Sequence, residues 1–216
     1  MSGDVHVRFC ERLGGRVPGA TRLIILVKSK RAGVRVLASI TRFVEQRLKL
    51  VVNDQKSQVA PVSRCKFLGF TFHGKQLRWH PKALAKFKRE VRRLTGRSRG
   101  ISMDARMEEL TTYLRGWINY FGIASGYQRC DDLDNWIRRR IRMCFWKQWR
   151  LPRTKVRNLI RLGVSLDEAI PAAMSSKGYW RNSRSKIIHR ALSNKHLEKL
   201  GLFSLRTRWV ELHYGS

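Results

Sequence analysis

The sequence predicts an α+β fold in which a small region of strands and one helix is followed by a mostly helical region. Short apolar and alternating runs that are typical of strands lie before position 80, at Leu23–Val27 and Lys66–Gly74. From Pro81 onward, apolar residues recur every three or four positions, as they do on the buried face of a helix. This change of pattern predicts a domain boundary near His80.

The first region begins with residues 1–22, which cannot be placed, and continues as a strand-and-helix segment over residues 23–80. Five consecutive apolar residues at Leu23–Val27 predict a buried strand, and apolar residues at helical spacing predict an amphipathic helix over Lys30–Leu50. The later predicted elements are an extended piece at 50–53, a polar turn at 54–57, a strand at 66–74, and a hairpin tip at Gly74-Lys75 that leads into 77–79.

Three helices account for most of residues 81–153. Their predicted bounds are 82–94, opened by Pro81; 103–121, capped by Ser102; and 133–149. Asp131, Asp132 and Asp134 fit the beginning of the third helix, where the helix dipole stabilises negative charge. This interpretation needs no metal ion.

The second of these helices carries several residues with a structural interpretation. Trp117 and Phe121 continue its apolar stripe, so we expect both in the core. Gly116 lies within the helix, where glycine costs about 1 kcal/mol relative to alanine. We therefore expect another backbone to approach closely at Gly116.

The C-terminal region, residues 154–216, is basic and less regular. Its predicted elements are a helix at 154–162 ended by Gly163, a short helix after a capping box at Ser165, a loop at 175–181, and a last helix at 187–200 ended by Gly201. We therefore expect a tail of short elements after the three longer helices.

The chain carries a large excess of positive charge. Lys and Arg total 46 against 15 Asp and Glu, which gives a formal net charge of +31 in 216 residues. This charge opposes compaction unless a polyanion neutralises it, so we expect nucleic acid as the partner rather than an anionic membrane surface. No apolar run is long enough to span a membrane, and the N-terminus has no signal-peptide pattern. We therefore expect a cytoplasmic protein.

Candidate catalytic and metal-binding residues are scarce. The four cysteines are widely separated, and none has a partner at the spacing of a zinc site. The carboxylates of residues 1–80 are at Asp4, Glu11, Glu45 and Asp54, and their positions do not predict the converging pair that two-metal nucleotidyl transfer needs. We therefore expect no catalytic residue, no metal site and no cofactor in this chain.

Basic residues interleave with aromatic ones, a combination that suits RNA because cations pair with phosphates and aromatic rings stack on unpaired bases. Four arginines wrap around the third helix, and we predict phosphate contacts for them: Arg138, Arg139, Arg140 and Arg142. No acidic residue occurs between Ile137 and Leu166 to balance them. The other RNA-binding candidates are Arg115 and Tyr120 on the second helix, and Lys177, Tyr179, Trp180 and Arg181 in the predicted loop.

Several motifs, taken in order, resemble the C-terminal half of bacterial group II intron-encoded reverse transcriptase/maturases. Leu50–Ser57 resembles a segment of the palm, with Lys56 at a lysine of the family. Leu114–Phe121 is similar to the maturase-specific motif of the thumb, also called domain X, and 177–181 and 191–202 resemble the tail that follows it. Four residues between these segments resemble the primer-grip hairpin that closes the palm: Phe67, Leu68, Gly69 and Phe70.

This resemblance implies a palm remnant at 23–80, a helical thumb at 81–153 and a basic tail at 154–216. It also implies binding of structured group II intron RNA and assistance of its splicing, with Lys56 among the RNA-binding residues. A complete family member adds reverse transcription and intron homing, which involve an RNA/DNA duplex and Mg²⁺.

The sequence departs from the family where polymerase catalysis resides. The family's Tyr-Ala-Asp-Asp turn directly precedes the strand that Leu23–Val27 resembles, but residues 19–22 read Gly-Ala-Thr-Arg. We therefore expect a truncated maturase that binds RNA without polymerase activity, and a frameshift upstream of Leu23 is one hypothesis for its origin. A polymerase with fingers and palm supplied in trans, and a degenerate gene product, stay open as alternatives, as does the oligomeric state.

Overall fold

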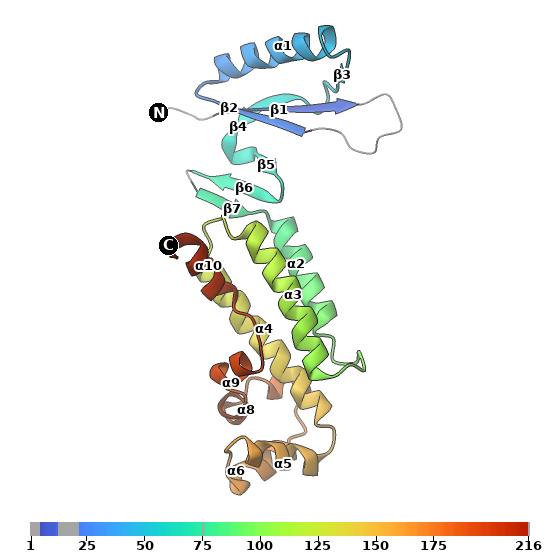
Figure 1. Ribbon diagram of the computed structural model, residues 1–216, viewed down its shortest axis with the longest axis vertical. Helices are drawn as coiled ribbons and strands as arrows, with labels where there is room; N and C mark the ends of the chain where they lie inside the picture. Colours follow the sequence, from blue (N-terminus) through green and yellow to red (C-terminus); the bar gives the residue numbers. More distant parts are fainter. Residues whose placement is uncertain (1–4, 13–21, 75, 216) are drawn as a thin grey trace. The chain divides into compact units, whose positions relative to one another are not determined.

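The computed structural model describes residues 5–12, 22–74 and 76–215. The chain divides into two compact units, Met1–Ala83 and Leu84–Ser216. Within the described residues, the strands belong to the first unit and the second unit is helical (Figure 1). The predicted α+β class, with a mostly helical C-terminal part, is therefore confirmed.

The first unit contains an antiparallel sheet around β1 (Val5–Arg12), a strand in the segment that the sequence left unplaced. One edge of β1 pairs with β2 (Arg22–Val27), and the other edge pairs with β4 (Gln58–Pro61) and β3 (Val51–Val52). β2 confirms the strand predicted at 23–27. The expectation that this strand is buried is wrong in part, because Leu26 in β2 is 58% exposed.

One helix, α1 (Lys30–Gln46), packs against this sheet and confirms the predicted amphipathic helix. The Ser29 hydroxyl caps it by accepting a hydrogen bond from the N–H of Ala32 at 3.2 Å. Val44 of α1 and Val52 of β3 are buried together. The apolar residues packed around this pair are Ile25, Val27, Val36, Leu37, Ile40, Leu50 and Val59.

A tight turn interrupts the strand predicted at 66–74, so that prediction is wrong. After a 3₁₀ turn, η1 (Val62–Arg64), the strands β5 (Lys66–Phe67) and β6 (Phe70–His73) pair antiparallel, with Phe67 opposite Phe70. Leu68 and Gly69 form the loop between them, with φ angles of 49° and 85°. Two successive positive φ values are what a type I′ hairpin turn requires. β6 then pairs with β7 (Gln76–Trp79), which confirms the hairpin predicted after 66–74, although Lys75 of its tip lies outside the described residues.

The second unit is built around three long helices that lie side by side, α2 (Pro81–Leu94), α3 (Met103–Phe121) and α4 (Tyr127–Gln148) (Figure 1). As predicted, Ser102 caps α3 by accepting a hydrogen bond from the N–H of Ala105 at 3.1 Å. The apolar stripes of the three helices meet in a core whose side chains are at most 1% exposed: Phe87, Leu110, Leu114, Ile118, Ile137 and Ile141. Burial of each such side chain stabilises the fold by about 1.5–3 kcal/mol.

The helix α4 begins six residues before its predicted start at Leu133. Its acidic residues therefore lie inside the helix, and one of them, Asp134, stabilises the start of another helix, α10 (Leu205–Tyr214). Asp134 is 3% exposed and accepts hydrogen bonds from the Ser204 hydroxyl at 2.7 Å and from the N–H groups of Leu205 and Arg206 at 3.0 Å. The prediction that these acids mark the beginning of their own helix is wrong, because α4 begins at Tyr127 and the partners of Asp134 lie about 70 positions away.

The C-terminal part consists of short helices, as predicted, but several bounds differ. α5 (Pro152–Arg161) and α6 (Leu166–Ala173) confirm the two helices predicted around Gly163. The predicted loop at 175–181 ends in a helical turn, α7 (Tyr179–Asn182). The helix predicted at 187–200 is two helices, α8 (Lys186–Ala191) and α9 (Asn194–Lys199), because the Ser193 hydroxyl caps the second by accepting a hydrogen bond from the N–H of His196. α10 was not predicted.

Candidate nucleic-acid interface

The four arginines of α4 divide between the protein interior and its surface. Arg138 is 8% exposed and Arg142 is 3% exposed, whereas Arg139 and Arg140 are half-buried. The Arg138 Nη1 donates a hydrogen bond to Asn135 Oδ1 at 3.2 Å, and its Nη2 lies 4.0 Å from Glu198 Oε1. Burial and these partners speak against a direct phosphate contact by Arg138.

Arg142 holds the junction between α8 and α9 against α4. Its Nε donates to the carbonyl of Leu192 at 2.9 Å, and its Nη2 donates to Asn194 Oδ1 at 2.9 Å. Burial, and next the charge of Arg138, lower the pKa of Arg142 to about 10. The guanidinium remains charged at neutral pH, but its nitrogens are directed to protein oxygens.

Arg139 attaches α7 to α4. Its guanidinium carbon lies 3.7 Å from the centre of the Trp180 ring, and its Nη2 donates to the Trp180 carbonyl at 3.1 Å. Cation–π contacts of this kind contribute about 0.5–2 kcal/mol. The contact fixes the orientation of Trp180, which keeps 38% of its surface exposed.

Arg140 lines a groove that also contains Trp136. Its Nη2 donates to the carbonyls of Arg92 and Thr95 at 3.3 Å, which satisfies free carbonyls at the C-terminal end of α2. The guanidinium carbons of Arg92 and Arg140 each lie 5.5 Å from the Trp136 ring centre. We call this cavity of about 400 Å³ the Trp136 groove, and its lining residues are Arg92, Arg97, Trp136, Arg140, Met143 and Trp180.

Tyr179 of α7 extends this cationic and aromatic surface. The guanidinium carbon of Arg97 and the Nζ of Lys147 each lie 5.2 Å from its ring centre. Arg92 and Arg97 are exposed, and the lining of the Trp136 groove contains no carboxylate. The arrangement offers cations for phosphates and rings with an apolar face for unpaired bases.

The family comparison falls on the same part of the chain. Residues 84–163 match the family model described as "Group II intron, maturase-specific domain". The helical unit contains a group II intron maturase-specific domain. The resemblance predicted from the sequence is therefore confirmed for this segment. A search of curated proteins gave no match.

The maturase-specific domain supplies most of the Trp136 groove, and α7 completes it from beyond residue 163. The sequence identified Arg140 and Trp180 as candidates but missed Arg92, Arg97 and Lys147, which belong to no motif. Their proximity can be seen only in the fold, because α2 and the loop after it bring Arg92 and Arg97 close to α4, which carries Lys147. Lys177 and Arg181, predicted together with Tyr179, are exposed, but neither lines the Trp136 groove.

A second group of predicted residues lies on α3. Arg115 and Tyr120 are both exposed, and the Arg115 guanidinium lies 5.7 Å from the Phe203 ring. The core prediction holds for Trp117, which is 8% exposed and lies 4.3 Å from the Phe87 ring. The expected close approach at Gly116 is wrong, because a Cβ built there would meet no described atom within 4 Å.

The remaining predicted residues belong to the first unit. Lys56 is exposed in the turn after β3, where its N–H donates to Asn53 Oδ1 at 3.2 Å. The four primer-grip-like residues form the β5–β6 hairpin, in which Leu68 is 62% exposed and Phe70 is buried. Their contact with RNA stays a prediction.

Among residues 5–12, 22–74 and 76–215, no group of three or more His, Cys, Asp or Glu side chains is placed to hold a metal ion. Over the same residues, no helix combines the length and apolar character that crossing a membrane requires.

Proposed function

We propose that this chain is a maturase that binds structured group II intron RNA in the cytoplasm and assists its splicing. The observation that carries the proposal is the coincidence of the maturase-specific match at 84–163 with the cationic and aromatic Trp136 groove. The net charge of +31 supports a polyanionic partner. An RNA/DNA duplex offers the same phosphate backbone and is the second partner that we propose.

The Trp136 groove and the neighbouring Tyr179 recognise RNA through two kinds of contact. Arg92 and Arg97 pair with backbone phosphates, while Trp180 and Tyr179 stack on unpaired bases of loops or bulges. Arg138 and Arg142 act indirectly, because they hold α4 and the α8–α9 junction in the geometry that presents the groove. Of the four arginines of α4 that were predicted to contact phosphates, we therefore keep Arg139 and Arg140 as candidates for direct RNA contact.

The proposal predicts binding that depends strongly on salt. If about 6–10 phosphates are contacted, affinity falls roughly 10³–10⁵-fold between 50 and 200 mM salt. A filter-binding titration against salt, with intron RNA and with an unrelated structured RNA of equal length, measures this slope and the specificity. Equal affinity for the two RNAs at 200 mM salt would contradict a maturase function.

The interface is tested by paired charge removal. Replacing Arg92 and Arg97 with Ala should weaken intron RNA binding about 10-fold or more and slow protein-assisted splicing at low Mg²⁺. The matched control replaces Arg157 and Arg161, two exposed arginines of α5 that do not line the Trp136 groove. The two double variants have the same net charge, so equal losses would contradict the assignment of this groove.

A further inference from the structure

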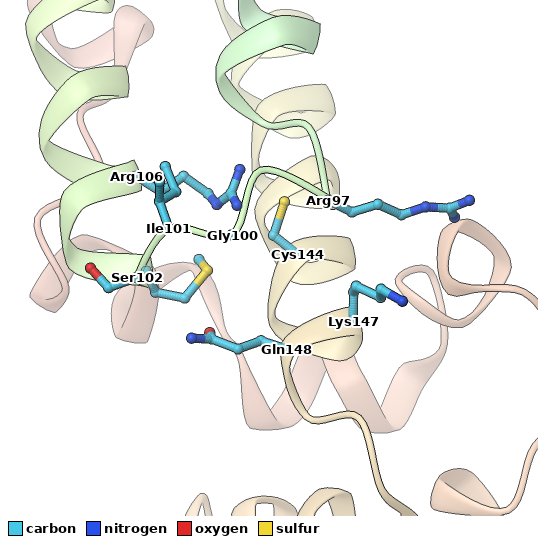
Figure 2. Close-up of a pocket in the computed structure, with 9 residues that line it drawn as sticks. Arg97, Gly100, Ile101, Ser102, Arg106, Cys144, Lys147 and Gln148 are labelled. Atoms are coloured by element: carbon cyan, nitrogen blue, oxygen red, sulfur yellow. The ribbon is translucent and has the colours of Figure 1, made fainter.

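A second cavity in the helical unit lies at the start of α3 and shares the lining residue Arg97 with the Trp136 groove. It has a volume of about 380 Å³, and we call it the Arg106 pocket (Figure 2). The residues of its lining that bear on ligand binding are Arg97, Ser102, Arg106, Cys144, Lys147 and Gln148. Three of these are cations and none is a carboxylate, so the lining favours an anion.

Arg106 is the unusual member of this lining, because it is 3% exposed and has no ion pair among the described residues. Its Nη1 donates to the carbonyls of Leu94 at 2.9 Å and Gly96 at 2.8 Å. These bonds satisfy Nη1, one of the three guanidinium nitrogens, at the C-terminal end of α2, where a cation is favourable. They provide no acceptor for Nε and Nη2.

The opposite edge of this guanidinium carries the unsatisfied donors. The Arg106 Nε is buried without a hydrogen-bond partner, and Nη2 makes no described hydrogen bond. Nε and Nη2 form the side of a guanidinium that binds two oxygens of a phosphate at once. A buried charged donor without an acceptor costs free energy, and an anion in the pocket offsets that cost.

The N-terminus of α3 adds a second source of positive potential. This helix has 19 residues and begins at the wall of the pocket, where Ser102 and Met103 belong to the lining. The first N–H groups of a helix have no intrahelical acceptor, and the helix dipole favours an anion beside them. The Ser102 oxygen accepts from Ala105, so its hydroxyl hydrogen is available to donate.

Arg97 and Lys147 lie farther out than Arg106. Figure 2 shows their side chains extending from the opposite side of the cavity, away from Arg106. Both also lie 5.2 Å from the Tyr179 ring, beside the surface assigned above to RNA. A chain of phosphates that follows this surface would therefore pass the mouth of the pocket.

We propose that the Arg106 pocket binds one phosphate group, held by the Nε–Nη2 edge of Arg106 and by the start of α3, and that in the complex this phosphate belongs to the RNA backbone. The second part rests on the proposed function. The first part does not, because the pocket chemistry is the same for inorganic phosphate.

Inorganic phosphate and the full-length chain provide the first test. At constant ionic strength, phosphate should shift the ¹⁵N-arginine Nε–H resonance of Arg106 and raise the unfolding temperature. Arg106→Lys keeps the charge but removes the two-nitrogen edge, so phosphate affinity should fall about 10-fold or more. The control Arg161→Ala should change it less than about 2-fold. Equal phosphate responses in wild type, Arg106→Lys and Arg161→Ala would overturn the pocket.

The folding of the variant is checked separately. If Arg106→Lys does not fold, the wild-type Arg106 resonance gives the result: a phosphate-dependent shift supports the pocket, and an unchanged resonance contradicts it. This arm uses no RNA, so its failure leaves the proposed function standing.

Intron RNA provides the second test. Saturating RNA should abolish the phosphate-dependent shift of the Arg106 resonance, and Arg106→Lys should weaken RNA binding about 10-fold. Phosphate binding with unchanged RNA affinity would show that free phosphate, and not the RNA backbone, is the ligand. If the wild-type chain does not bind intron RNA at all, the proposed function is refuted, and the result with inorganic phosphate still stands.

Discussion

Replacing Arg142 with Ala tests whether this arginine holds the fold or contacts RNA. The substitution removes two charge-assisted hydrogen bonds, to the Leu192 carbonyl and to Asn194 Oδ1, each 2.9 Å long. Such bonds contribute about 1.5–3 kcal/mol each, and the loss is partly offset because a buried cation disappears. We expect a net loss of about 2–4 kcal/mol in the free energy of unfolding. For a unit of this size, that corresponds to roughly 10 °C in unfolding temperature.

Thermal unfolding of the full chain, followed by circular dichroism at 222 nm, measures this loss. Arg142→Lys keeps the charge but not the forked geometry and should fall between wild type and Arg142→Ala. Arg161→Ala, on the exposed face of α5, should stay within about 0.5 kcal/mol of wild type. The reasoning is refuted if Arg142→Ala is as stable as Arg161→Ala and instead loses RNA affinity.

Three further substitutions test local features. Leu68→Asn should stabilise the chain by about 1 kcal/mol, because asparagine tolerates the φ of +49° better than leucine, and urea unfolding that shows a loss would contradict the strained turn. Gly116→Ala should add about 1 kcal/mol of helix stability in the same assay, since the added methyl group meets open space; destabilisation would reveal a neighbour at that position. Burial is the main cause that raises the pKa of Asp134, so this carboxyl contributes most stability below its unfolded pKa of about 4, and that contribution is lost as pH rises through the folded value. The unfolding free energy of wild type minus that of Asp134→Asn should therefore fall as pH rises, and a constant or rising difference in a pH series of urea titrations would refute this.

Local patterns were sufficient for the elements whose partners are close in sequence. β2, α1, α2 and α3 follow from their apolar patterns, together with signals such as Pro81 at the start of α2 and the Ser102 cap of α3. The sequence does not predict the early start of α4, because Asp134 accepts hydrogen bonds from residues of α10. A cluster of acidic residues gives the same sequence pattern whether it stabilises its own helix or another one. Long-range pairing cannot be read from spacing alone.

The candidate site shows the same limit. The arginine run was recognised, but Arg142 and Arg140 have the same sequence context, and only the fold distinguishes a buried clamp from a groove residue. Arg106 gave no signal at all, because a single arginine in an amphipathic helix is ordinary until its burial is known.

Ultraviolet crosslinking of the full chain to group II intron RNA, with the crosslinked peptides identified by mass spectrometry, tests the central claim most directly. Crosslinks should concentrate on the aromatic residues of the groove and its rim, Trp136, Tyr179 and Trp180, and replacing both Arg92 and Arg97 with Ala should remove them. Crosslinks that avoid these residues and lie on α5 and α6 would place the RNA elsewhere and contradict it.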